Sequence, residues 1–228
     1  MPSKNVIKQY VEDGFYHIYN RGVEKRVIFE NNQDYKVFLN YLKIYLLPPT
    51  EPKERKITIK NYTFIAPGKP LKNYNEKIDL LAYCLMPNHF HLLIKQKGKM
   101  TIEKFMRSLS TKYSTYFNKK YDRVGSLFQG PYKAVLVNND EQLLHLSRYI
   151  HLNPVKDSPL HMAYSSYADY LDLRQTSWVN KKTILSFFKS TQNKHHNGTL
   201  SYQIFVEDYQ QDKKELIDQI SLDAKENP

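Results

Sequence analysis

The chain has 228 residues, of which 41% are hydrophobic and 14% aromatic, enough to build one large domain or one domain with an appendage. It has 34 Lys and Arg against 23 Asp and Glu, a formal charge of +11 that indicates a polyanionic partner, either nucleic acid or an anionic membrane surface. The single cysteine excludes an internal disulfide framework and a multi-thiolate metal site, and no apolar run is long enough to span a bilayer. The first residues do not form the apolar core of a signal peptide, so we expect a cytoplasmic protein.

The first part of the chain contains one strand-like and one helix-like pattern. The stretch FYHIYN alternates and is rich in aromatic and β-branched residues, which predicts a strand. In NNQDYKVFLNYLKIYLL, apolar residues recur at helical spacing behind an Asn/Asp cap, so we expect a helix that ends at the following pair of prolines. Residues 48–77 mix Pro, Lys, Glu and Asn around one short strand candidate, ITIKNYTFI, and this composition predicts an elaborated connection rather than a second domain.

The central part contains the clearest strands and helices. Two apolar runs, LLAYCLM and HLLIK, are typical of strands, and TIEKFMRSLSTKYSTYFNKKY has the three- and four-residue spacing of a helix. A turn-rich stretch, RVGSLFQGPYKAVLVNN, then leads to another helix, DEQLLHLSRYIHLN. Strands and helices that alternate without phosphate-loop glycines predict an α+β sheet with helices packed on one face.

The pattern loosens toward the C-terminus. SSYADYL and TILSFF are candidates for short helices, and KELIDQISLDAKENP has the composition of a charged tail. We therefore expect one main domain over residues 1–160 and a mostly helical C-terminal extension with a charged tail over residues 161–228.

Two histidines lie at the start of the second apolar run. On a strand, His89 and His91 share one face while Phe90 points to the other, so two imidazoles can reach one ion. Two histidines do not complete a metal site, and a pair of half-buried packing histidines is the alternative. The best third donor is Asn153, at a helix end where Pro154 is expected to bias its backbone out of helical geometry.

A tyrosine accompanies this asparagine. Tyr149 lies four residues before Asn153 and therefore on the same face of the helix. Beside a metal-bound phosphodiester, a tyrosine can act as a nucleophile and form a covalent phosphotyrosine, whereas core packing is the alternative role. Several other chemically interesting residues are expected to be core, packing or surface residues: His17, Cys84, Tyr113, Tyr116 and His151.

Four stretches in the order FYHIYNRG, AYCLMPNHFHLLI, GSLFQGPYKAVLV and RYIHLNPVK together resemble the HUH single-tyrosine transposases, and more closely their REP-associated tyrosine transposase branch. HUH stands for histidine, a bulky hydrophobic residue and histidine. The resemblance implies a ferredoxin-like HUH domain of the α+β class, with a central antiparallel sheet and helices packed on it.

The same resemblance implies a function and a set of site residues. It implies metal-dependent nicking and strand transfer of single-stranded DNA at hairpins, in which a tyrosine becomes linked to a 5′ phosphate and a 3′ hydroxyl is released. His89 and His91 correspond to the metal ligands, Tyr149 to the nucleophile and Asn153 to the third ligand, where insertion-sequence relatives more often carry Gln. The implied cofactor is a divalent metal, Mg²⁺ or Mn²⁺. Pro131 stands where an arginine is expected in these proteins.

Basic residues near these motifs are candidates for contacts with DNA. Between Thr101 and Val135 the chain has seven basic residues against two acidic ones, interleaved with Tyr and Phe, which can neutralise phosphates and offer stacking faces to unpaired bases. The residues selected as DNA contacts, because they lie in or beside the motifs, are Arg21, Gln129, Lys133 and Arg148. We therefore expect single-stranded or hairpin DNA as the partner, a nucleoid-associated location and the possibility of a homodimer.

Three other functions remain as alternatives. The chain could be a catalytically inactive DNA-hairpin-binding protein derived from a transposase, or a metal-dependent hydrolase that uses water instead of tyrosine. A role at a membrane surface fits the charge, but the sequence lacks a distinct basic amphipathic helix, so we rank this role last.

Overall fold

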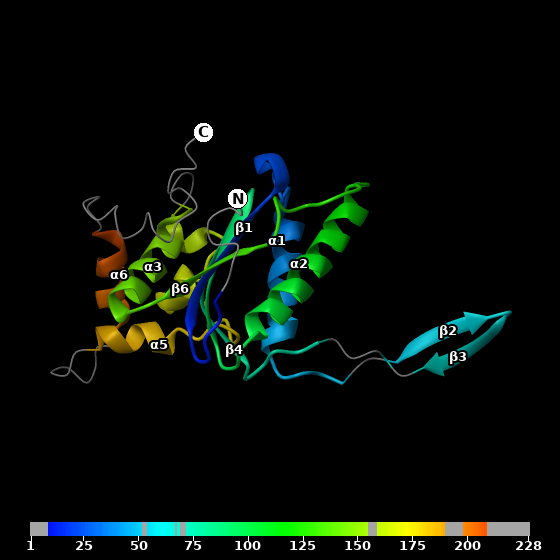
Figure 1. The fold of residues 1–228 in the computed structure, drawn as a ribbon, viewed down its shortest axis with the longest axis horizontal. Coiled ribbons are helices and arrows are strands. Elements are labelled where there is room, and N and C mark those ends of the chain that lie inside the picture. Colours follow the sequence, from blue (N-terminus) through cyan, green and yellow to red (C-terminus); the bar gives the residue numbers. More distant parts are fainter. Residues whose placement is uncertain are drawn as a thin grey trace.

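A computed structural model describes residues 9–51, 54–66, 68, 72–154, 159–189 and 198–208. Its centre is an antiparallel sheet with helices on both faces, and a separate hairpin extends from this body (Figure 1). This arrangement confirms the expected α+β class with a central antiparallel sheet and helices packed on it.

The central sheet has the strand order β4-β5-β1-β6, and its neighbouring strands are all antiparallel. Its strands are β1 (Phe15–Arg21), β4 (Ile78–Met86), β5 (His89–Gln96) and β6 (Lys133–Val137). The first three were expected from their apolar patterns. The fourth lies within the stretch that was expected to be turn-rich, and it was not identified because a strand of five residues at a sheet edge gives only a short apolar pattern.

Two long helices cover one face of the sheet. These are α1 (Asn32–Leu46) and α2 (Thr101–Lys120), both expected from their periodic apolar residues. A capping box starts α1: the Asn31 side chain accepts a backbone N–H of the first turn, and the Asp34 carboxylate accepts the backbone N–H of Asn31. The side chain of Phe90 on β5 is fully buried beneath these helices, so the core on this side holds β5 in place.

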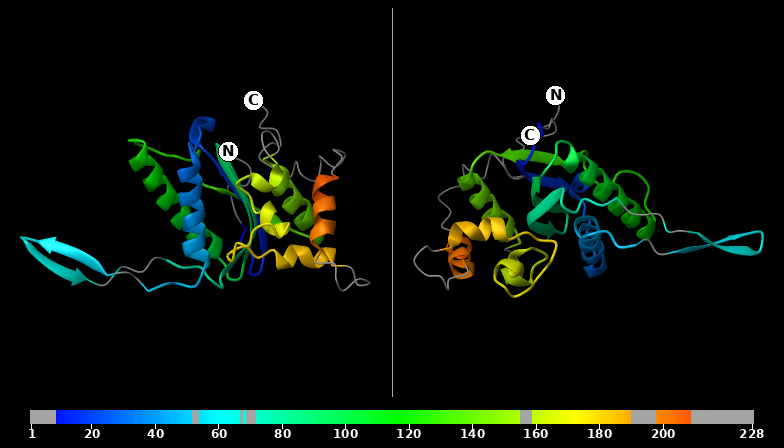
Figure 2. Two further views of the ribbon diagram at one scale, coloured as in Figure 1. Left: turned by 180° about the vertical axis from the view of Figure 1, so that it is seen from behind. Right: turned by 90° about the horizontal axis from the view of Figure 1, so that it is seen from below.

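Helices also cover the opposite face, which corrects the expectation that all helices pack on one side (Figure 2). The elements there are α3 (Asp140–Leu152), α4 (Tyr167–Tyr170), α5 (Lys182–Leu185) and α6 (Thr199–Glu207). The physical reason is that β4 and β5 are apolar on both faces. Leu81 and Leu93 belong to a second buried cluster with Leu146 of α3, and such near-continuous apolar runs are typical of strands covered on both sides.

The short C-terminal helices pack into this second cluster. Tyr167, Tyr170 and Tyr202 are buried there, close to Cys84, whose burial confirms that it is a core residue. The division of the chain near residue 160 stays a prediction. The expected charged tail, KELIDQISLDAKENP, lies outside the described residues. In the part of the chain that the structure describes, no helix is long and apolar enough to cross a membrane.

The connection between α1 and β4 contains a two-stranded hairpin, where one strand was expected. Its strands are β2 (Arg55–Ile59) and β3 (Tyr62–Ala66), and both views in Figure 2 show it extending away from the sheet and helices. Lys60 and Asn61 both have positive φ, as the tightest hairpin turns require. This turn splits ITIKNYTFI into two strands.

Candidate active site

The two histidines of β5 face the side of the sheet that α3 covers. His89 and His91 alternate with Phe90, which points into the opposite core, so the expected sharing of one face by the two imidazoles is what the strand produces. Their ring centroids are 5.0 Å apart and the rings are almost perpendicular, at 88°. His91 is fully buried and His89 is half-buried, so this pair lies where the sheet interior meets its surface.

The helix α3 brings the two other predicted site residues to the same place. The side-chain oxygen Oδ1 of Asn153 lies 3.3 Å from Nε2 of His89. The ring of Tyr149 packs edge-on against His91, with centroids 5.4 Å apart. Four residues from a strand and from a helix terminus distant in sequence therefore converge within a single chain.

The backbone of Asn153 differs from the expectation. It has φ −55° and ψ −35°, which is helical, so the following proline does not push it into an extended conformation. The preference against helical geometry before proline is only a bias, and here Asn153 keeps the helical path at the end of α3. Its short side chain nevertheless reaches His89, because the end of the helix lies against the sheet.

Neighbouring hydrogen bonds determine the tautomer of His89. The amide nitrogen of Asn88 donates to the carbonyl oxygen of Lys25 at 3.2 Å, so its oxygen Oδ1 is the atom that faces Nδ1 of His89, at 2.6 Å. Because an amide oxygen can only accept, Nδ1 of His89 carries the proton. In the neutral ring, Nε2 then has a lone pair that faces the side-chain oxygen of Asn153.

In the neutral imidazole these two acceptors, 3.3 Å apart, would repel, and either a proton on Nε2 or a metal ion between them removes the repulsion. Two donors that each lie about 2.1 Å from one ion are roughly 3.0–3.4 Å apart for octahedral or tetrahedral angles, so the observed separation fits one shared ion. One imidazole nitrogen and one amide oxygen form a mixed N/O donor pair suited to a hard or borderline divalent ion. His89 and Asn153 therefore fit the expected metal.

A neighbouring side chain also occupies one ring nitrogen of His91. Nδ1 of His91 lies 2.8 Å from Nε2 of His17, and both side chains are fully buried. Its other nitrogen, Nε2, is buried and has no hydrogen-bond partner among the described residues. Burial lowers the pKa of His91 well below its usual range, and the neighbouring His17 and His89 act in the same direction. A neutral imidazole with one buried, unpartnered nitrogen is what a metal ligand requires.

His17 is a site residue that the sequence did not identify, since it was expected to be a surface or packing residue. It lies on β1, where Tyr19 pairs with His91 and His17 pairs with Leu93. The alternation of FYHIYN does place His17 on one face with Tyr19, but only the register between β1 and β5 brings it to His91. Among the described residues, no group of three or more His, Cys, Asp or Glu side chains could hold a metal, so the third donor would be an amide.

Three of the four predicted DNA contacts lie at the same end of the sheet. Arg21 is the ladder partner of His89, and the backbone N–H of the exposed Gln129 donates to the carbonyl oxygen of Arg21. The ammonium group of Lys133 lies 6.0 Å from the ring of Tyr19. This end of the sheet therefore presents cationic and amide groups beside the two histidines.

Arg148 does not have the position that a DNA contact requires. It is buried, its Nη1 donates to the carbonyl oxygen of Phe205 on α6, and its guanidinium lies 4.3 Å from the Phe205 ring centroid. It faces α6 because the position before Tyr149 points to a different side of α3. Two expectations of packing roles are confirmed: His151 is buried and bonds to Ser166, and Tyr113, on α2, is fully buried.

Some basic residues of α2 also have structural partners. Arg107 pairs with Glu103 of the preceding turn, and Lys120 pairs with the buried carboxylate of Asp34 at 2.7 Å. Lys104 and Lys112 are exposed. Exposed lysines on this helix are therefore available to phosphates, while others stabilise the fold.

One family model and two solved structures are similar to this chain. The model of the family "Transposase IS200 like" matches residues 53–153. The solved structure of a REP-associated tyrosine transposase bound to a REP hairpin is similar with a TM-score of 0.50 and 13% identity, covering 78% of this chain and 98% of that chain. A candidate transposase from Deinococcus radiodurans R1 has a TM-score of 0.37 and 13% identity, covering 63% of this chain and 93% of that chain. No curated protein sequence matches the chain.

The family match and the REP-associated structure confirm the resemblance stated from the sequence. At 13% identity, the structural similarity concerns the fold. The family match supports transposase-like DNA processing as the class of activity.

Proposed function

We propose that this chain, an IS200-like transposase by similarity, nicks single-stranded DNA beside a hairpin and transfers the strand through a covalent phosphotyrosine at Tyr149. The observation that carries the proposal is the convergence of Tyr149 and Asn153 on the two histidines of β5 within one chain. The hairpin-bound relative supports hairpin DNA as the substrate.

In this proposal His89, His91 and Asn153 hold one divalent ion, Mg²⁺ or Mn²⁺. When bound, the ion polarises the scissile phosphate and neutralises the charge that develops on it. His17 and Asn88 act on the protein side: each occupies the second nitrogen of a ligand imidazole and keeps the other nitrogen turned toward the ion. The low pKa of His91 keeps this ligand neutral over the physiological pH range.

The chemical step is an exchange of one phosphoester for another. The phenol of Tyr149 releases its proton to solvent and its oxygen attacks phosphorus, while the bond from phosphorus to the 3′ oxygen breaks and solvent returns a proton to the leaving oxygen. The 3′ oxygen leaves as a hydroxyl, and the 5′ phosphate stays on Tyr149. Attack by a 3′ hydroxyl on this intermediate reverses the exchange and joins the strand, so the step requires no oxidant, reductant or nucleotide.

Other groups at this end of the sheet orient the DNA. The guanidinium of Arg21 and the ammonium of Lys133 lie on the same side of the sheet as the histidines, where the backbone of a bound strand would carry its phosphates. The amide of Gln129, on the loop before β6, is exposed and can contact a base or a phosphate. Because these contacts are largely ionic, we expect DNA affinity to fall steeply with salt concentration.

Incubation with hairpin-bearing single-stranded DNA and Mn²⁺ tests the proposal. We expect a protein–DNA adduct that survives denaturing electrophoresis and is absent in Tyr149→Phe. Tyr41→Phe, a partly exposed tyrosine on α1, is the matched control and should form the adduct normally. Hairpin binding without cleavage would instead indicate an inactive hairpin-binding protein, and cleavage without a protein-linked product would indicate a hydrolase that uses water.

A further inference from the structure

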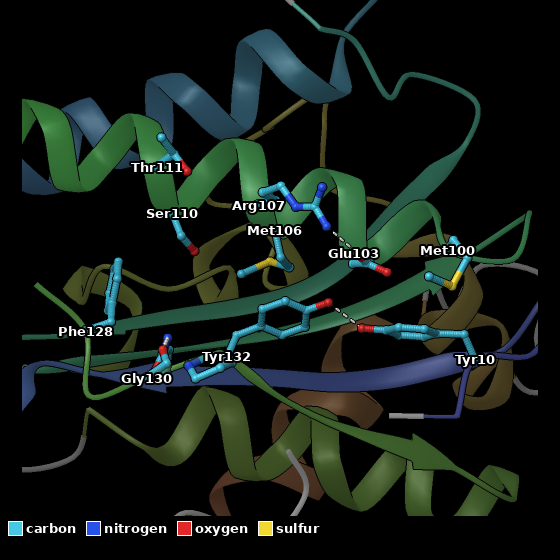
Figure 3. Close-up of a pocket in the computed structure, with 12 residues that line it drawn as sticks. Tyr10, Met100, Glu103, Met106, Arg107, Ser110, Thr111, Phe128, Gly130 and Tyr132 are labelled. Atoms are coloured by element: carbon cyan, nitrogen blue, oxygen red, sulfur yellow. Dashed lines mark hydrogen bonds and ion pairs between the residues drawn. The ribbon is translucent and has the colours of Figure 1, made fainter. Parts of the chain in front are cut away.

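A cavity lies on the other face of the sheet from the histidines, between α2 and the segments that flank β1. It measures about 520 Å³. Figure 3 shows the rings of Tyr10 and Tyr132 lying end to end along one wall, with Met106 and Arg107 of α2 on the opposite wall. The two tyrosine hydroxyls are hydrogen-bonded to each other, which joins the two rings into one continuous wall. We call this cavity the tyrosine trough.

The lining of the trough suits flat, partly polar rings. Tyr10 and Tyr132 are only partly buried, so their rings remain accessible from the cavity. Across the trough, the buried Met106 forms the apolar base of the lining and the hydroxyls of Ser110 and Thr111 supply hydrogen-bonding groups. Nucleobases have both properties, an apolar face that stacks on aromatic rings and polar edges that bond to hydroxyls.

The position of the trough connects it to the candidate active site. Asn20 lines one end of the trough, and the next residue, Arg21, is the ladder partner of His89. The pairing of β1 with β6 ends at Tyr19 and Lys133, so the edge of the sheet beyond this point consists of the loop before β6. The Asn20 amide donates to the carbonyl oxygen of Gly130 in that loop. A DNA strand that passes this edge of the sheet can therefore reach both faces of the sheet.

We propose that the tyrosine trough binds one or two unpaired nucleobases of the strand that carries the scissile phosphate, stacked on Tyr132 and Tyr10. This inference rests on the proposed function and adds a site for the unpaired flank of the substrate. Arg107, which lines the trough beside Glu103, provides a cationic group for a phosphate between these bases. Stacking on tyrosine tolerates any base, so the trough increases affinity for an unpaired flank with little dependence on its sequence.

Equilibrium binding in EDTA, where no metal-dependent cleavage occurs, tests the trough directly. The probes are a DNA hairpin with an unpaired flank that contains 2-aminopurine, and the same hairpin without the flank. We expect Tyr132→Ala to weaken binding of the flanked hairpin between about 5-fold and 100-fold, and to leave binding of the flankless hairpin unchanged. Tyr132→Phe retains the ring and should bind almost as the wild type does. Tyr62→Ala, on the projecting hairpin, is the control for loss of an exposed tyrosine.

Equal affinity of Tyr132→Ala and wild type for the flanked hairpin would overturn the inference, as would an equal loss for both probes. Photocrosslinking of wild-type protein to a flank with 5-iododeoxyuridine gives an answer that does not depend on the folding of any variant. Crosslinks are expected at Tyr132 or Tyr10, and their location elsewhere would also overturn the inference. If wild-type protein binds neither probe, the proposed function fails, which is a different result from selective failure of the trough.

Discussion

Substitution of His17 tests whether its contact with His91 positions that histidine to bind a metal ion. His17→Leu removes the group that lies 2.8 Å from Nδ1 of His91 and leaves that nitrogen without its buried partner. An unsatisfied buried donor costs about 1–3 kcal/mol, and the loss of a partner behind a metal-ligating histidine typically costs 10–100-fold in metal affinity, which is about 1.4–2.8 kcal/mol. The first figure is a loss of folding stability and the second a loss of metal affinity, so we expect Mn²⁺ affinity to fall by one to two orders of magnitude.

The assay is isothermal titration of each folded variant with Mn²⁺, without DNA. His17→Gln places an amide oxygen near the position of Nε2 and should restore most of the affinity. His161→Gln, at an exposed histidine outside the sheet, is the control and should bind Mn²⁺ as the wild type does. If His17→Leu is folded and binds Mn²⁺ with wild-type affinity, the hydrogen bond from His91 does not position the ligand and the reasoning is refuted.

Three further predictions follow from the same geometry. Because Tyr149 lies beside His91 of its own chain, mixing Tyr149→Phe with His91→Ala should not restore adduct formation, and recovery of the adduct would reveal an exchanged site. Asn153→Ala should clearly weaken Mn²⁺ binding, since the Asn153 oxygen faces His89, and should change the melting temperature only slightly. Titration calorimetry measures the affinity and scanning calorimetry measures the melting temperature. Burial would raise the pKa of Asp34, but hydrogen bonds from Lys120 and two tyrosines outweigh it and lower the pKa. The stabilisation of the folded state by the ionised Asp34 is therefore fully present above a pH of about 4, the pKa of this carboxyl in the unfolded chain. It is lost as the pH falls through the lower pKa of the folded state. Asp34→Asn should cost roughly 1.5–3 kcal/mol at neutral pH and progressively less in acid, as urea denaturation can measure.

Local patterns in the sequence were sufficient for the elements that carry the site. The alternation of His89, Phe90 and His91 predicts which side chains share a face, because side chains on a strand alternate in direction. The spacing of Tyr149 and Asn153 likewise places both on one side of α3. These statements depend only on neighbours in sequence, which is why they could be made without a structure.

Features that depend on distant contacts could not be derived in this way. The bond between His17 and His91 exists because β1 pairs with β5 in one particular register, and no local pattern specifies that register. Arg148 was expected to contact DNA, but α6 docks against it and buries it. The coverage of the sheet on both faces likewise results from packing among segments that are far apart in sequence.

The most direct test of the central claim is the location of Mn²⁺ in a crystal of the protein, determined from its anomalous scattering. We predict one peak in contact with Nε2 of His89, Nε2 of His91 and Oδ1 of Asn153, beside the Tyr149 ring. A peak bound elsewhere, with none between these three donors at saturating Mn²⁺, would contradict the account.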